Sequence, residues 1–292
     1  KGDEYVTTPY PLTDDIDAMY AHLREFEAGG GGDMPESVNE ALDEAINKMK
    51  WSSDRDVLKI VFLVGDAPPH MDYEQGPKYP DLCRAAAKKD LIINTVQCGN
   101  IGDTTPIWKE IAKLSEGSYA AIAQSGNMAV VSTPMDEKLA ELNRRMGETL
   151  IPYGDAEVRQ EVLGKQRLAE AAAPAAAADR LSYNAATRKA VQGRGELIDA
   201  LTKNELKPDE IDQKKLPADM QKLTHDEVGM RIAKAREDRA ALQKEIEQVS
   251  KDRAAYIAQE TKRLAAAGKG DSFDETVAQT IRAQAEKKGM HY

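Results

Sequence analysis

The apolar run IVFLV at residues 60–64, followed at once by Gly-Asp-Ala-Pro-Pro, is the feature that most constrains how this chain can fold. A short apolar run bounded by turn residues is typical of a strand buried on both faces, and such strands occur mainly in parallel sheets flanked by helices. Ligands of α/β proteins bind at the carboxyl edge of the sheet. The sequence therefore places Asp66 at this edge and makes it a candidate metal ligand.

A second acidic loop comes earlier in the chain. Residues 28–37, AGGGGDMPES, carry four glycines directly before Asp33, and a helical pattern follows them. Glycines let the backbone approach an ion closely, and Pro35 suits the first turn of a helix. Two loops, each carrying an acid, are therefore expected to meet above the sheet. The alternative is that Asp33 only caps the helix and that Glu36 supplies a first-turn charge that favours the helix dipole.

These two motifs, GGGD-x-PE in the first loop and GDAPPH at the strand end, resemble those of a bacterial subgroup of the von Willebrand factor A domain family. The resemblance covers residues 1–150 and implies a Rossmann-like, doubly wound, mostly parallel sheet. It also implies a metal-ion-dependent adhesion site that binds Mg²⁺ or Ca²⁺ through oxygen ligands, with an acidic group of a protein partner completing the coordination. The metal ligands expected on this basis are Asp66, Asp33 and Glu36. The expected binding face around them comprises Gly31, Gly32, Ser37, Asp103 and Thr104.

Two members of this binding face have a second interpretation. Asp103 and Thr104 follow the strand predicted at residues 91–97, so they lie at a carboxyl strand end. They can line the binding face, or they can simply cap the helix predicted at 106–115, which is the favoured use of such residues.

The family's first motif, Asp-x-Ser-x-Ser after a central strand, does not occur in the sequence. We therefore expect an incomplete metal site and a sheet in which one strand lacks a hydrogen-bonding neighbour. Another chain that completes the sheet, or residues outside this sequence, would supply the missing strand. Because an open sheet edge invites pairing with another chain, the alternative function is that of a structural or assembly protein of a cell-surface or extracellular complex with no functional metal site.

The two cysteines leave two possibilities open. Cys83 lies in the first turns of the helix predicted at 80–89, and Cys98 ends the strand predicted at 91–97. A helix running away from the carboxyl edge and a strand returning to it would bring both residues to one edge, which makes a disulfide credible and indicates an oxidising compartment. Otherwise they are two buried thiols that act as small hydrophobic residues. The expected location is periplasmic, extracellular or at the cell surface, with the cytoplasm as the alternative.

Composition and motifs exclude several classes of function. A formal charge of −10 argues against a nucleic-acid-binding protein that relies on phosphate neutralisation, although local basic patches remain compatible with it. No apolar run approaches the length of about 20 residues that spans a bilayer. The sequence contains no Gly-x-Ser-x-Gly, Walker, His-Glu-x-x-His or Cys-x-x-Cys motif, so we expect a binding or scaffolding protein rather than an enzyme. A hydrolase that activates water with the metal would lack a paired base.

The second half of the chain differs in character from the first. From residue 151 it is rich in Ala, Lys, Glu and Arg, and Pro174 interrupts an alanine-rich segment. We expect a partial von Willebrand factor A-like domain over 1–150 and a helical region over 151–292. Helical periodicity in the first domain predicts helices over 14–27, 35–50, 80–89, 106–115 and 135–146. The helices predicted in the second region cover 155–173, 179–201, 227–266 and 273–288.

Overall fold

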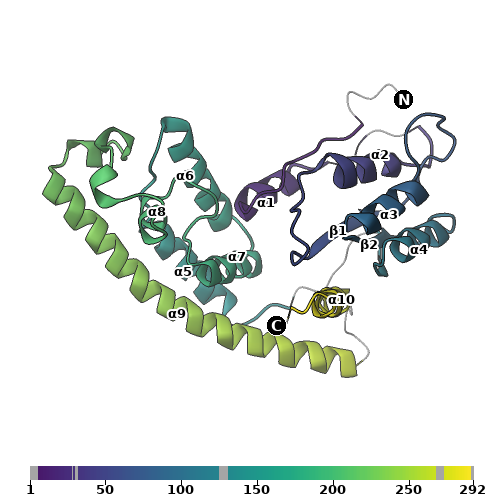
Figure 1. Ribbon diagram of the computed structural model, residues 1–292. Coiled ribbons are helices and arrows are strands. Elements are labelled where there is room, and N and C mark those ends of the chain that lie inside the picture. The colour runs from purple at the N-terminus through teal and green to yellow at the C-terminus, as the bar shows by residue number, and fades with distance from the viewer. Residues whose placement is uncertain (1–5, 28, 30–31, 125–130, 268–272, 291–292) are drawn as a thin grey trace. The chain divides into compact units, whose positions relative to one another are not determined.

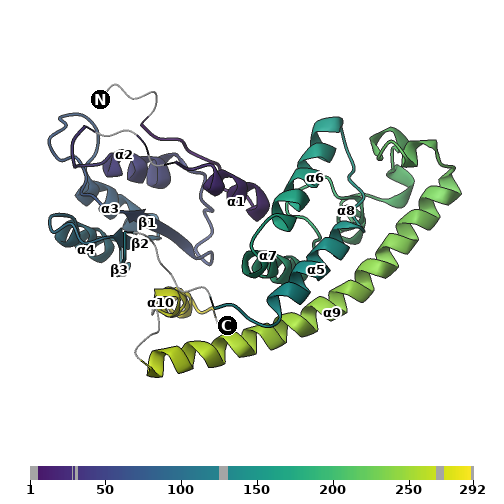
Figure 2. The same ribbon diagram turned by 180° about the vertical axis from the view of Figure 1, so that it is seen from behind.

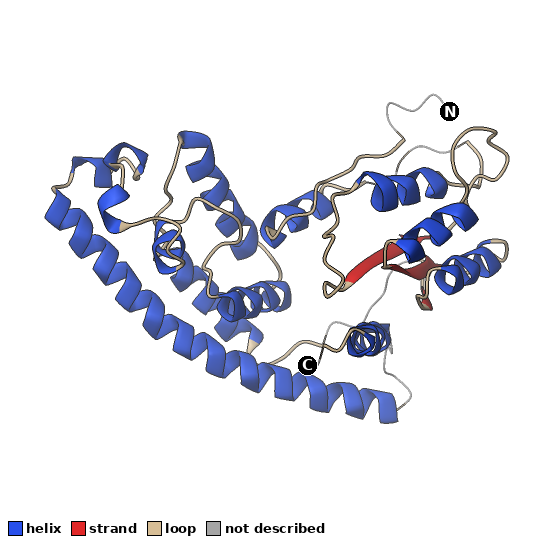
Figure 3. Cartoon of the chain, in the orientation of Figure 1, coloured by secondary structure: helices blue, strands red, loops and turns tan. Residues whose placement is uncertain are grey.

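The apolar run at residues 60–64 forms a strand of a parallel sheet in the computed structural model, which describes residues 6–27, 29, 32–124, 131–267 and 273–290. The strand β1 (Lys59–Gly65) pairs with β2 (Leu91–Cys98), which pairs in turn with β3 (Tyr119–Ile122) (Figure 1). Both pairings are parallel, and the strand order is β1-β2-β3. Figure 3 draws these strands in red among the helices. The prediction of an α/β fold followed by a helical C-terminal region is confirmed at this level.

Helices cover one face of this sheet. They are α2 (Val38–Asp43), η1 (Glu44–Lys48), α3 (Tyr79–Lys88) and α4 (Thr104–Leu114). Side chains at alternate positions of a strand point to the same face, and Val61, Leu63 and Ile93 point toward these helices and share one core with them. The single helix predicted over residues 35–50 is divided, because its second half is π-helical.

The opposite face of the sheet is covered in part by α10 (Phe273–Lys287), which lies beyond the sheet from α2 and α3 in both ribbon views (Figures 1 and 2). Asn94 of β2 and Gln284 of α10 exchange two side-chain hydrogen bonds of 3.1 and 2.8 Å. Phe62 and Val64 of β1 share this face by register, yet they are 40% and 59% exposed. The outer strand of the sheet therefore presents apolar side chains to solvent.

The chain divides into two units, and neither is a continuous segment. Unit 1 comprises residues 1–12, 28–129 and 269–292, and unit 2 comprises 13–27 and 130–268. This division differs from the single boundary after residue 150 that the change in composition suggests. The helix α1 (Ile16–Arg24) belongs to unit 2 because Arg180 donates two hydrogen bonds, of 2.7 and 2.8 Å, to the carboxylate of Asp17.

Unit 2 is a helical assembly. Its elements are α1, α5 (Asp136–Gly147), α6 (Ala156–Glu170), α7 (Pro174–Thr187), α8 (Leu197–Thr202), η2 (Pro208–Glu210), η3 (Gln213–Lys215), η4 (Met220–Lys222) and α9 (His225–Ala266). One of its cores joins Leu142 of α5, Leu181 of α7 and Ile246 of α9. None of the helices in the described parts of the chain is both long enough and apolar enough to cross a lipid bilayer.

The helix predicted over residues 179–201 is wrong in its second half. Pro174 occupies the first turn of α7, where its missing N–H is not needed, and α7 then ends at Thr187. Arg188 follows in the left-handed conformation with φ of 55°, and Gly193 and Gly195 also have positive φ. A helix cannot continue through such a segment, so α8 begins only at Leu197.

A buried arginine joins three elements of unit 2. Arg239 of α9 donates to both oxygens of Glu196, at 2.8 and 3.0 Å, and to Asp199 at 2.8 Å. It also donates to the carbonyl of Thr149 at 3.1 Å. Burial and the neighbouring carboxylate of Glu196 raise the pKa of Asp199 to about 6, although Arg239 opposes this rise. One guanidinium therefore holds two carboxylates in a place where they would otherwise repel each other.

The assignment of the two sheet faces predicts unequal losses of stability. We expect Ile93→Ala to lower the free energy of unfolding of unit 1 by about 2–5 kcal/mol, because it leaves a cavity in the core. The matched control, Val64→Ala on the solvent-exposed side, should change it by less than about 0.5 kcal/mol. Urea unfolding followed by tryptophan fluorescence reports on unit 1, since both tryptophans, Trp51 and Trp108, lie there. Equal losses in the two variants would contradict the assignment.

The buried carboxylate of Asp199 predicts a pH dependence. Its folded pKa of about 6 lies above its usual value of 3.8, so the folded state binds this proton more tightly than the unfolded state. The stability that Asp199 contributes is therefore complete below about pH 4 and is lost as the pH rises through 6. In Asp199→Asn we expect a smaller decrease in unfolding free energy between pH 4 and pH 6, measured by urea unfolding and circular dichroism. Parallel pH profiles of the two proteins would refute this.

Candidate functional site

The carboxyl end of β1 is held in place by the start of α4. Thr104 is buried, and its hydroxyl donates to the carbonyl of Asp66 at 2.8 Å. One turn later, the indole N–H of Trp108 donates to the carbonyl of Ala67 at 3.3 Å. A Cβ atom at Gly65 would lie 3.1 Å from the Trp108 ring, so glycine allows this close approach. Two residues of one helix therefore fix the turn that presents Asp66.

The side chain of Asp66 is oriented by the segment that follows β3. The amide Nε2 of Gln124 donates to Oδ2 of Asp66 at 2.7 Å. Gln124 lies directly over Gly99, where φ is +76° and a Cβ atom would come within 2.2 Å of Oε1 of Gln124. The other oxygen, Oδ1 of Asp66, accepts no hydrogen bond from the described residues and is free to bind a ligand.

The two acidic loops meet, as the sequence predicts. Glu36 and Pro69 form a parallel bridge, in which the N–H of Glu36 donates to the carbonyl of Pro68 at 2.8 Å and the N–H of His70 donates to the carbonyl of Glu36 at 3.1 Å. The buried side chain of Asn39 donates to the carbonyl of His70 at 2.5 Å. The first loop and the start of α2 are therefore joined to the loop that follows Asp66.

The predicted metal ligands are not gathered into one group. Asp33 is 66% exposed, and its Oδ2 lies 3.5 Å from Nε2 of His70, while Glu36 joins the bridge through its backbone. His70 is buried, and its Nδ1 lies 2.8 Å from Asp72, whose pKa is lowered by this hydrogen bond. Within the described ranges, no three His, Cys, Asp or Glu side chains converge as a metal-binding group. These residues by themselves therefore do not fit a divalent cation.

The residues expected on the binding face have different surroundings. Thr104 serves the turn at Asp66, whereas Asp103 is exposed at the N-cap of α4 and makes no side-chain capping bond there. Ser37 occupies the N-cap of α2 and also makes no side-chain capping bond. Gly32 is exposed, and Gly31 lies outside the described residues.

The disulfide considered between Cys83 and Cys98 is not formed, and both are free thiols. Cys83 belongs to the core between α3 and the face of β2 that carries Ile93. Cys98 has the strand parity of Asn94, so its side chain lies on the opposite face of the sheet. Burial, with a smaller contribution from Glu110, raises the pKa of the Cys83 thiol to about 12. Burial and the charge of Asp66 also raise the pKa of Cys98.

Two residues that organise this site are not evident from the sequence alone. Gln124 follows the last strand, and no local pattern relates it to Asp66, from which it is far apart in sequence. Asn39 is a buried polar residue at the start of a helix, one turn before the core residue Leu42. In the sequence, Asn39 stands out only as a polar residue next to the apolar positions of the helix, and this does not indicate which residue it binds.

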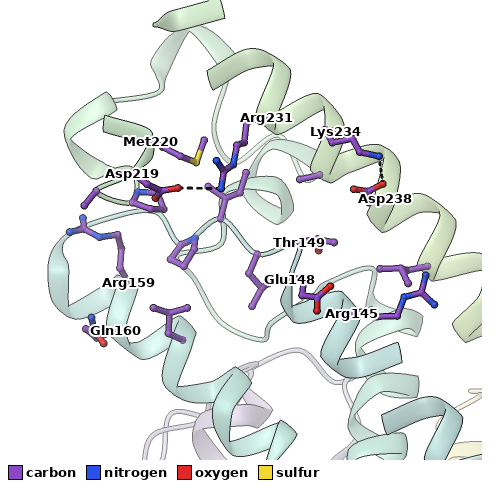
Figure 4. Close-up of a pocket in the computed structure, with 18 of the residues that line it drawn as sticks. Arg145, Glu148, Thr149, Arg159, Gln160, Asp219, Met220, Arg231, Lys234 and Asp238 are labelled. Atoms are coloured by element: carbon purple, nitrogen blue, oxygen red, sulfur yellow. Dashed lines mark hydrogen bonds and ion pairs between the residues drawn. The ribbon is translucent and has the colours of Figure 1, made fainter. Parts of the chain in front are cut away.

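Unit 2 contains a separate cavity of about 760 Å³, with charged side chains around an apolar wall (Figure 4). Arg231 pairs with Asp219 at 3.2 Å, and Lys234 pairs with Asp238 at 2.7 Å, as the dashed lines show. Four cations and three acids line the cavity, so these pairs leave a formal surplus of one positive charge. The cavity therefore offers mainly apolar contact, with a charge surplus too small to select a strongly charged ligand.

Comparisons with protein-family models, with curated proteins and with solved structures find no match to the chain. The resemblance to the von Willebrand factor A domain family therefore rests on the two sequence motifs and remains a prediction. What the structure adds is the meeting of the two loops that carry these motifs.

The positions of the two thiols predict different reactivities. We expect Cys98, which is partly exposed, to react with Ellman's reagent in the folded protein, while Cys83 reacts only after denaturation, because a thiol must be accessible and ionised to attack. Absorbance at neutral pH measures both phases. In Cys98→Ser the folded-state phase should disappear. If both thiols react equally fast in the folded protein, the assignment of Cys83 to the core is contradicted. If neither thiol reacts after denaturation without reductant, the assignment of both residues as free thiols is contradicted.

Proposed function

We propose that this chain is a protein-interaction module that binds an extended segment of a partner along the outer edge of β1. The observation that carries the proposal is that β1 is an outer strand with exposed apolar side chains. β1 pairs on one side with β2 and forms the end of the described strand order. Its side chains Phe62 and Val64 are 40% and 59% exposed.

Physical chemistry supports a β-strand as the occupant. Strands of parallel sheets are normally covered on both faces, so an outer parallel strand with an exposed apolar face is an unfavourable arrangement in water. An added strand would form hydrogen bonds with the outward backbone N–H and C=O groups of β1. Every second side chain of that strand would lie beside Phe62 and Val64 on the same face of the sheet, and apolar side chains there would reduce the exposure of these two residues. The segment we propose is therefore extended, with apolar residues at every second position.

The second candidate is the metal-dependent form of this interaction, and a specific observation favours it. Asp66 follows β1 directly, and its Oδ1 is free of hydrogen bonds from the described residues. A strand added beside β1 would end near this carboxylate. By the resemblance to the von Willebrand factor A domain family, that strand would carry Asp-x-Ser-x-Ser. Its oxygens would complete a site for Mg²⁺ or Ca²⁺, to which an acidic group of a protein partner then binds.

A synthetic peptide tests both forms. Its sequence is an apolar strand followed by Asp-Gly-Ser-Gly-Ser, with a fluorescent label, and its binding to the full chain is measured by anisotropy in Mg²⁺ and in EDTA. We expect saturable binding that Val64→Lys weakens by about tenfold or more, because a charge replaces the apolar contact. Met230→Lys is the matched control, since Met230 is an exposed apolar residue of unit 2.

The two forms differ in their dependence on Asp66. If the interaction depends on metal, Mg²⁺ strengthens binding and Asp66→Asn removes this gain. If binding is equal in Mg²⁺ and EDTA, the chain acts as an assembly protein without a functional metal site. Absence of saturable binding, or binding that Val64→Lys leaves unchanged, would overturn the proposal.

A further inference from the structure

A cavity of about 700 Å³ lies at the amino ends of β1 and β2, at the end of the sheet opposite to Asp66. Lys59, the first residue of β1, lines this cavity together with Asp90, which directly precedes β2. Further walls come from the turn after η1, the end of α3 and Lys288 near α10. All of these residues belong to unit 1.

The lining of this basic cavity is strongly cationic. Its positively charged residues are Lys50, Arg55, Lys59, Lys88, Lys89 and Lys288. Asp90 is the one acid among the lining residues, so six cations and one acid leave a formal surplus of five positive charges. The whole chain carries a formal charge of −10, so this concentration of cations runs against its overall balance.

Backbone carbonyls, rather than carboxylates, hold several of these cations. Lys59 is only 5% exposed, and its ammonium donates to the carbonyl of Ser52 at 3.3 Å. Lys89 donates to the carbonyl of Ile46 at 2.8 Å and to the side-chain oxygen of Asn47 at 2.7 Å. Neutral oxygens orient an ammonium group but do not neutralise it. An ammonium can donate three hydrogen bonds, so the buried Lys59 keeps donor capacity.

The single carboxylate of the cavity, that of Asp90, interacts with more than one of its cations. Lys288 donates to Asp90, and this hydrogen bond, together with the nearby charges of Lys59 and Arg55, lowers the pKa of Asp90. Lys50, Arg55 and Lys88 form no side-chain hydrogen bond or ion pair with the described part of the chain. The cavity thus contains a buried ammonium and several cations without an anionic partner.

We propose that the basic cavity binds a small ligand that carries two or more phosphate groups. The volume lies in the range of about 300–1,000 Å³ that is usual for small-molecule sites and exceeds what a single inorganic ion needs. Trp51 also lines the cavity, and its indole N–H donates a 2.6 Å hydrogen bond to the carbonyl of Ala45. Cations around a concave site concentrate a multiply charged anion from solution. The acidic charge of the remaining chain disfavours a long nucleic acid, and a flat membrane surface does not enter a concave site.

Calorimetric titration of the full chain with inorganic pyrophosphate at physiological salt tests this proposal, with the fluorescence of Trp51 and Trp108 as a second signal. We expect saturable binding at one site that is at least about tenfold tighter than the binding of sulfate, because a second phosphate group adds charge-assisted hydrogen bonds. The double variant Arg55→Gln/Lys88→Gln should weaken it by about tenfold or more. Both residues are exposed, and their side chains form no hydrogen bond or ion pair with the described residues.

The matched control is Lys203→Gln/Lys262→Gln, which removes the same charge from exposed positions of unit 2 and should leave the affinity unchanged. Equal weakening by both double variants, or equal affinities for sulfate and pyrophosphate, would mean an adventitious ion only and would overturn the proposal. Absence of saturable binding would overturn it too. Binding of DNA or of anionic vesicles through Arg55 and Lys88, without binding of pyrophosphate, would replace the small ligand by a macromolecular surface. The peptide experiment on β1 is independent of these outcomes.

Discussion

The parallel pairing of β1 with β2 is the interaction on which unit 1 depends. Its register joins Lys59 to Leu91 at one end and Gly65 to Gln97 at the other. Because the two strands run in the same direction, both of their carboxyl ends lie at one edge of the sheet and both of their amino ends lie at the opposite edge. The carboxyl edge presents Asp66, and the amino edge presents Lys59 beside Asp90 and the other cations of the basic cavity. One pairing thus separates an acidic end from a cationic end.

Buried or partly buried arginines join the helices of unit 2 by pairing with carboxylates, which the pattern of apolar residues alone would not suggest. Arg180 binds Asp17, Arg239 binds Glu196 and Asp199, and Arg253 of α9 binds Asp136 and Asp179. In each case the arginine comes from a different helix than the carboxylates that it binds. A planar guanidinium can bind two oxygens in a fixed geometry, so each cluster specifies orientation as well as proximity. Only 5% of the residues are aromatic, and these clusters supply specificity that large side chains provide in other cores.

The sequence predicts well what local pattern determines. The apolar run before Asp66 predicts its strand, and the glycine-rich loop is correctly expected to meet the loop after that strand. Contacts between side chains distant in sequence leave no such pattern. Nothing local relates Gln124 to Asp66, Asp17 to Arg180, or Gln284 to Asn94. The last two contacts explain why α1 joins unit 2 and why a C-terminal helix joins the sheet, against the boundary that composition suggests at residue 150.

The disulfide considered between the two cysteines does not form because their side chains lie on different faces of the sheet, which follows from the alternation of side chains along β2. Leu91 and Ile93 face the helices, so Cys98, an odd number of positions from Ile93, faces the other side, away from Cys83 on α3. The expectation of a shared edge considered the ends of the elements and not the faces of the strand. The same parity, carried across the register to β1, puts Phe62 on the face of Asn94. The alternation that keeps the thiols apart therefore also leaves Phe62 and Val64 outside the main core.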